Sequence, residues 1–141
     1  MTYGGRKASL PVTVTQSTRP RPVSYLYDVL PILSKAGCNQ GACHGNGEGR
    51  GGLKMSLKGE NPVDDHEVLV RHGGGRRVST ANPGASLLLL KATSAIPHGG
   101  GQRFSPNSDE YASIARWVAE GARIDGPDAP RLERIEVSPQ E

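Results

Sequence analysis

The chain has little of the material from which protein interiors are usually built. Only six of its 141 residues are aromatic: four Tyr, one Phe and one Trp. It has 19 Gly and 11 Pro, a content that approaches the roughly 25–30% typical of low-complexity chains. A large aromatic core is therefore excluded, and we expect something other than aromatic side chains to fill the interior.

Long hydrophobic runs and charge of one sign are also missing. The longest apolar run is Leu87–Leu90, far short of the ~18 residues that a membrane span requires. The net charge of +3 comes from 17 basic and 14 acidic residues. In nucleic-acid-binding proteins, basic residues commonly alternate with aromatics or follow one helix face. The basic residues of this chain do neither. We therefore predict a soluble domain with no membrane span and no nucleic-acid partner.

The two ends of the chain are typical of linkers and fragments of neighbouring domains. Two strand-like segments and two linker-like segments flank the central region: Leu10–Thr15, Thr18–Pro22, Asp125–Pro130 and Leu132–Val137. We expect one domain at 22–124, with 1–21 and 125–141 leading to β-domains of the same parent chain. No signal peptide is recognisable, which carries little weight for a domain excised from a larger protein.

Hydrophobic periodicity and capping residues predict a mostly α-helical domain. The segments with helical spacing are Val23–Lys35, Asp64–Arg71, Ser86–Lys91 and Ser108–Glu120. Pro31 is expected to kink or shorten the first helix, because proline lacks an N–H donor. Gly41–Gly52 contains six glycines and is predicted to be a loop. The alternation over Leu53–Lys58 predicts a short strand.

The two cysteines and a histidine form the one motif that points to specific chemistry. Cys38 and Cys43 are the only cysteines, and His44 follows the second directly. A cysteine pair ending in Cys-His is typical of covalent c-type haem attachment. In such sites the two thiols form thioethers with the haem vinyl groups, and the histidine ligates the iron. The usual spacer has two residues. Here it has four, so the extra chain must loop out.

Three other interpretations of the motif remain open. Cys38 and Cys43 could form a disulfide that closes a small loop in an exported protein. They could bind zinc together with His44 and a fourth ligand recruited from elsewhere in the chain. They could also be unpaired structural cysteines.

Four further motifs follow the cysteines along the chain. They are Gly51–Leu57 (G-G-L-x-x-S-L), Pro83–Lys91 (P-x-x-S-L-L-L-L-K), Ile96–Gly101 (I-P-H-G-G-G) and Trp117–Ala122 (W-V-A-E-G-A). In this order the chain resembles the planctomycete cytochrome c domain, in its variant with the longer cysteine spacing. The resemblance covers roughly residues 22 to 122. It implies a small class I cytochrome c-like helical fold wrapped around one covalently attached haem c, as a module of a large exported protein.

A six-coordinate haem needs a second axial ligand besides His44. The family commonly has Met-Pro before the last helix, but this chain has Ile96-Pro97, and isoleucine cannot ligate iron. We expect His98 to be the distal ligand, with Met55 as the second choice. The remaining candidates are Met1, His66 and His72, or an open site.

Contacts with the rest of the haem are also expected. Cationic side chains could pair with the two haem propionates; the candidates are Arg76, Arg77, Arg103 and Lys91. Trp117 is expected to pack near the haem edge. A covalently held porphyrin would supply the apolar surface that the aromatic side chains do not, so we expect the haem-free domain to be poorly folded.

These observations favour a non-enzymatic electron-transfer domain that passes electrons to a redox partner protein. The alternatives are a haem-based sensor or catalytic site whose distal ligand is displaced by a small molecule, and a haem-free, disulfide-closed binding module. Because haem is attached to cysteines after export, the parent protein is expected to be periplasmic or extracytoplasmic.

Overall fold

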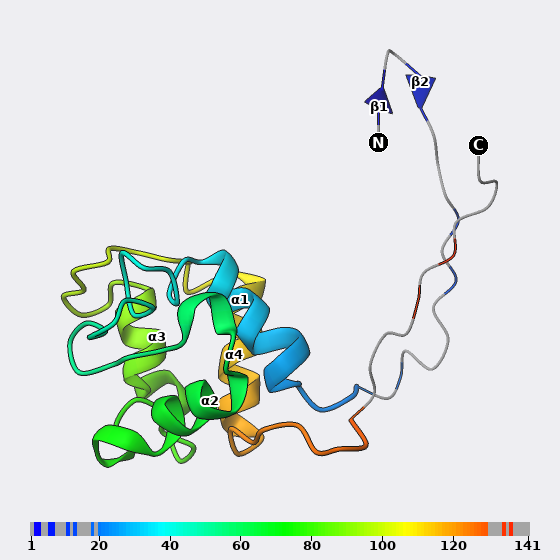
Figure 1. The fold of residues 1–141 in the computed structure, drawn as a ribbon. Helices are drawn as coiled ribbons and strands as arrows, with labels where there is room; N and C mark the ends of the chain where they lie inside the picture. Colours follow the sequence, from blue (N-terminus) through cyan, green and yellow to red (C-terminus); the bar gives the residue numbers. More distant parts are fainter. Residues whose placement is uncertain are drawn as a thin grey trace.

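The computed structural model describes residues 20–129 without a gap, together with 2–3, 6–7, 11, 13, 18, 134 and 136. The helical elements are the π-helical turn Tyr25–Val29, α1 (Leu30–Lys35), the short turn Leu57–Gly59, α2 (Pro62–Val70), the turns His72–Gly75 and Pro83–Ala85, α3 (Leu87–Ala92) and α4 (Asp109–Ala119). β1 (Thr2–Tyr3) and β2 (Arg6–Lys7) form a two-residue antiparallel pair outside the helical domain (Figure 1). The strands predicted at 10–15 and 132–137 fall mostly outside the described residues.

The four predicted helices are confirmed, so the described domain is mostly α-helical. The side chains of Ser24 and Ser108 accept hydrogen bonds from the backbone N–H groups of Tyr27 and Tyr111, and so begin the first and last helices. The second helix begins earlier than predicted. Asn61 caps α2 in place of an aspartate, and Pro62 occupies its first turn.

Pro31 neither breaks nor ends the first helix. The turn before it is wide, because the N–H of Leu30 donates to the carbonyl of Tyr25, five residues back. Proline has no N–H to place in the helix and crowds the preceding turn. A widened π-helical turn accommodates both effects, and the helix continues to Lys35.

The strand predicted at Leu53–Lys58 is wrong. Leu53 forms only an isolated bridge with Arg50, and a helical turn begins at Leu57. The alternating pattern arose because the side chains of Leu53 and Met55 face the interior of the domain. The segment itself has no partner strand among the described residues. Leu57 breaks the pattern, with 42% of its surface exposed.

The aromatic side chains form a small core between the first helix, α2 and α4. Tyr25 and Trp117 are fully buried, with ring centroids 5.5 Å apart, and His66 packs edge-on against both. The indole N–H of Trp117 donates to the carbonyl of Arg123. Trp117 does not line the cavity described below, and its place near a haem edge stays a prediction.

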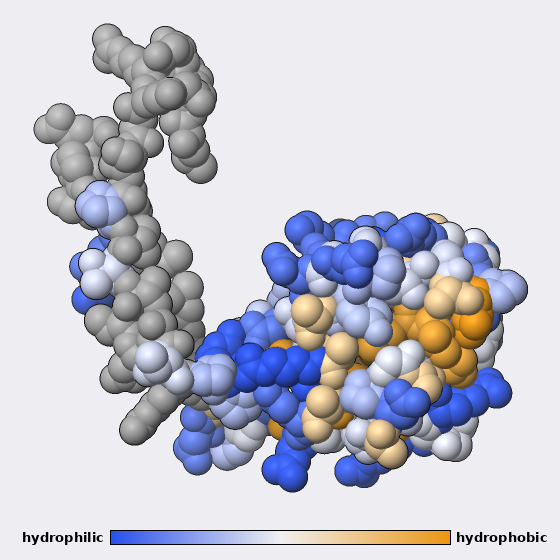
Figure 2. All heavy atoms as spheres, turned by 180° about the vertical axis from the view of Figure 1, so that it is seen from behind, coloured by the Kyte–Doolittle hydropathy of each residue, from blue (hydrophilic) through white to orange (hydrophobic). Residues whose placement is uncertain are grey.

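Apolar surface gathers at the end of the domain that carries α3, away from the segments leading to the termini (Figure 2). Among the four leucines of α3, only Leu89 is fully buried. Among the described residues, no helix is long and apolar enough to cross a membrane.

Candidate functional site

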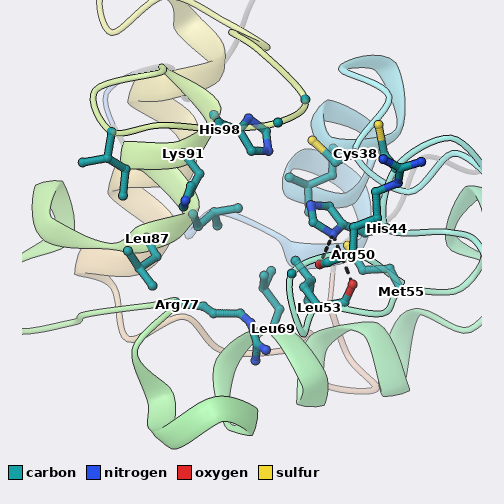
Figure 3. Close-up of a pocket in the computed structure, with 18 of the residues that line it drawn as sticks. Cys38, His44, Arg50, Leu53, Met55, Leu69, Arg77, Leu87, Lys91 and His98 are labelled. Atoms are coloured by element: carbon teal, nitrogen blue, oxygen red, sulfur yellow. Dashed lines mark hydrogen bonds between the residues drawn. The ribbon is translucent and has the colours of Figure 1, made fainter. Parts of the chain in front are cut away.

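A cavity of about 560 Å³ lies between the loop that follows the cysteines and α3 (Figure 3). Its volume is within the range of roughly 300–1,000 Å³ typical of cofactor sites. The lining is mostly apolar, with contributions from Leu33, Leu53, Met55, Leu69, Leu87, Leu88 and Ile96. Cys38, Cys43, His44 and His98 also line it. The fold thus brings the predicted attachment and ligand residues to one cavity.

A tight turn orients the ring of His44. The backbone N–H and C=O groups of Arg50 and Leu53 bond to each other, each at 3.0 Å. Gly51 and Gly52 between them both have positive φ, +59° and +74°, as a type I′ turn requires. The His44 Nδ1 atom lies 3.1 Å from both carbonyl oxygens of this turn (Figure 3).

These contacts determine the tautomer of His44. Carbonyl oxygens can only accept, so Nδ1 carries the proton, and Nε2 keeps its lone pair for a ligand. Burial lowers the pKa of His44, which further favours the neutral ring. A histidine tied in this way through Nδ1 has the arrangement usual in metal-ligating imidazoles.

The four-residue spacer between the cysteines is accommodated as a folded turn. The N–H groups of Cys43 and Gly45 both donate to the carbonyl of Gln40, and the N–H of His44 donates to the carbonyl of Cys38. The backbone is so close at Gly45 that a Cβ there would lie 2.1 Å from the Asn39 oxygen. The spacer therefore loops out and leaves Cys38 and Cys43 at the cavity wall.

Both cysteines are free thiols in the structure. Burial raises the pKa of Cys38 to about 11, and the nearby positive charge of Arg103 opposes this rise. A buried thiol with so high a pKa is a weak nucleophile at neutral pH. The high pKa of Cys38 therefore does not suit a catalytic cysteine, and suits a thiol whose reaction another protein promotes.

His98 faces His44 across the cavity (Figure 3). The two rings are within 12° of parallel, and their centroids are 6.4 Å apart. Nδ1 of His98 donates to the carbonyl of Gly101 at 2.8 Å, so its Nε2 also keeps a free lone pair.

Gly100 allows His98 this position. A Cβ at Gly100 would lie 2.9 Å from Cε1 and 3.2 Å from Nε2 of the His98 ring, whereas a Cβ at Gly99 would meet nothing within 4 Å. The ring therefore packs against the backbone of its own loop at a place where a side chain does not fit.

Of the other predicted ligands that the structure describes, the two histidines lie outside the cavity and Met55 lines it. His66 is buried and bonds through Nε2 to the carbonyl of Ala122, and His72 is exposed on the turn after α2. Neither lines the cavity. Met55 does line it and is 3% exposed. Met1 lies outside the described residues.

The predicted propionate partners divide into two groups. Arg76 and Lys91 line the cavity, although the ammonium group of Lys91 also donates to the carbonyl of Pro97. Arg77 lines it too, but its guanidinium is buried and donates to backbone carbonyls. Arg103 is not among the lining residues and donates to the carbonyl of Ala36.

Sequence reasoning missed Arg50, an exposed residue that lines the cavity. The sequence signal that could have identified Arg50 is its position directly before the two turn glycines, because the turn that holds His44 also places Arg50 at the rim of the cavity. The lining residues thus include four cations, Arg50, Arg76, Arg77 and Lys91, and no carboxylate.

Comparisons with protein families, with curated proteins and with solved structures found no match. The chemistry of the site therefore rests on its own residues. Among the described residues, no three His, Cys, Asp or Glu side chains come together as a metal site.

The walls of the cavity are apolar, the charged groups among its lining residues are all positive, and the rings of His44 and His98 face each other inside it.

Proposed function

We propose that residues 22–124 form a c-type cytochrome domain that binds one haem covalently in this cavity and transfers electrons. The observation that carries the proposal is the pair His44 and His98, nearly parallel and 6.4 Å apart across the cavity, each with Nδ1 bonded to a carbonyl. The motif order that resembles the planctomycete cytochrome c domain supports the same function.

In this proposal the two cysteines attach the cofactor. Cys38 and Cys43 would each hold the haem by a thioether formed when the S–H group adds across a vinyl double bond, an addition that needs no oxidant or reductant. The turn at residues 38–45 presents Cys38 and Cys43 to the cavity and holds His44 directly beside them. Attachment after export places the parent protein in the periplasm or another extracytoplasmic compartment.

The two histidines define the kind of chemistry. When bound, haem iron supplies a one-electron redox couple. Because His44 and His98 would both be used to hold the iron, neither would be left to receive a substrate, which favours electron transfer to a partner protein over catalysis. Two imidazoles also favour a lower reduction potential than a histidine–methionine pair, since thioether ligation raises the potential.

The cations at the rim would hold the acidic edge of the cofactor. Arg50 and Arg76 are exposed, and the structure shows no hydrogen bond or ion pair of their guanidinium groups with the described residues. Both are placed to pair with carboxylates. Arg77 and Arg103 already donate hydrogen bonds to backbone carbonyls, so we do not assign them to the propionates.

The test is expression of the full chain together with a c-type cytochrome maturation system. We expect a red protein whose mass includes one haem, retained after denaturation, with a low-spin spectrum in both oxidation states. Replacing His98 with Ala should give a high-spin spectrum, and His72→Ala, which changes a histidine outside the cavity, should leave it low-spin. A colourless protein with two free thiols or a Cys38–Cys43 disulfide would contradict the proposal.

A further inference from the structure

Arg77 is a buried arginine that contacts three separate backbone segments. Its guanidinium donates to the carbonyl of Val68 at 3.0 Å, to that of His72 at 2.7 Å, and to that of Gly52. The side chain is 8% exposed, and no salt bridge to Arg77 is formed among the described residues. The planar fork of an arginine suits such a multiple contact, whereas a lysine ammonium cannot reproduce it.

The Gly52 carbonyl belongs to the turn that orients His44. Side-chain packing at the tip does not hold this turn, since a Cβ at Gly51 or Gly52 would meet nothing within 4 Å. The hydrogen bond from Arg77 reaches Gly52 from 25 residues away in the chain. It therefore connects the turn to the end of α2 and to the segment after it.

We propose that Arg77 is a positioning residue for His44, and that it acts through this turn. By holding Gly52, Arg77 holds the flanking carbonyls of Arg50 and Leu53 that accept the Nδ1 proton of His44. The assignment rests on the proposed function in so far as His44 ligates haem iron. A hydrogen bond at Nδ1 makes the imidazole a stronger electron donor, which stabilises oxidised iron and lowers the reduction potential.

Arg77→Lys in the haem-loaded protein separates this role from the effect of charge. Lysine keeps the positive charge but loses the three-way contact, so the Nδ1 hydrogen bond weakens and the reduction potential rises. We also expect the Nδ1 proton of His44, followed by NMR in the reduced protein, to exchange with water about 2- to 10-fold faster, as for the loss of one ordinary hydrogen bond. Arg71→Lys, at an exposed arginine that does not line the cavity, should change neither quantity.

A second pair of variants keeps Arg77 itself and guards against misfolding. A Cβ at Gly73 would lie 3.0 Å from the Arg77 guanidinium, whereas one at Gly74 would meet nothing within 4 Å. Both glycines have positive φ, +69° and +73°, so Gly73→Ala and Gly74→Ala carry similar backbone strain. Only Gly73→Ala should raise the potential and the proton exchange rate.

Two results would overturn the positioning role. One is an unchanged potential and exchange rate in both Arg77→Lys and Gly73→Ala. The other is a potential that falls in Arg77→Gln and stays constant in Arg77→Lys, since removal of a nearby positive charge alone would act in that way. Failure of the proposed function is distinguishable, because the wild-type chain would then carry no haem, and the exchange of the His44 proton would still be compared between variants in the haem-free protein.

Discussion

At the scale of single residues, the two histidines of the cavity have the same chemistry, but different hydrogen bonds hold their rings in place. Nδ1 of His44 reaches two carbonyls of a turn that Arg77 connects to α2. Nδ1 of His98 reaches one carbonyl, three residues ahead in its own loop. The distal side therefore depends on the local backbone of residues 98–101, and Gly100 is the residue at which this dependence can be measured.

Gly100→Ala should displace the His98 ring, because the new Cβ would lie 2.9 Å from Cε1. In the haem-loaded protein we expect a partial change from a low-spin to a high-spin spectrum and faster binding of carbon monoxide to the reduced form. Gly47→Ala is the control and should behave as the wild type, since Gly47 does not line the cavity and its Cβ would meet nothing within 4 Å. Equal spectra of the two variants would argue against His98 as the distal ligand.

At the scale of elements, the helices could be predicted because the signals for each one, a capping residue and an apolar face, lie within its own segment. Ser108 caps α4, and its apolar residues recur on one face, of which Ile114, Trp117 and Val118 are buried. The strand at Leu53–Lys58 was wrong for the opposite reason: alternation records which side chains face inward, and only tertiary structure decides whether a partner strand exists. The π-helical turn before Pro31 was equally beyond local rules.

The candidate site was predictable where its chemistry is carried by residue type. Cys38, Cys43, His44 and His98 do line one cavity. The cations could not be sorted from sequence, because Arg76 and Arg77 are neighbours and only the fold shows that one is exposed and the other bonded to three carbonyls. The role of Trp117 could not be decided from sequence, because burial in an aromatic cluster and burial against a cofactor leave the same sequence pattern.

Helix α2 also holds the chain that follows Met55. Asp65 is 1% exposed and accepts hydrogen bonds from both the backbone N–H and the hydroxyl of Ser56. Asp65→Ala should lower the free energy of unfolding by about 2–4 kcal/mol, since it leaves two donors without a charged acceptor. Asp64→Ala, at an exposed neighbour, should cost no more than about 1 kcal/mol. Urea unfolding of both variants measures the difference, and similar losses would contradict this role for Asp65.

At the scale of the whole molecule, the aromatic cluster and the cavity share one hydrophobic core, since Leu33, Met55 and Leu69 line the cavity and belong to the same buried cluster as Tyr25 and Trp117. The cluster of Tyr25, His66 and Trp117 joins the first helix, α2 and α4. The cavity is enclosed largely by the loops at 42–53 and 96–100 together with α3. The expectation of a poorly folded haem-free chain therefore applies to the cavity loops more than to the aromatic core.

Hydrogen exchange should reveal this division. In the haem-free protein we expect slow exchange for the amides of α4 and the first helix, and fast exchange over 41–53 and 97–102. Haem attachment should slow exchange in the two loops, because a bound group stabilises the closed state. Peptide-resolved mass spectrometry compares the two forms. Uniform protection throughout the haem-free domain would contradict the prediction.

The chain enters and leaves the helical domain at one place (Figure 1). The N–H of Val23 donates to the carboxylate of Glu120, the N–H of Leu26 donates to that of Asp125, and the guanidinium of Arg116 donates to the carbonyl of Arg21. A force that pulls on the two flanking segments would therefore act first on these three hydrogen bonds. It would leave the cavity, which lies near α3, unstrained. The two flanking segments are thus held together at one end of the domain, and the cavity lies away from that end, near α3.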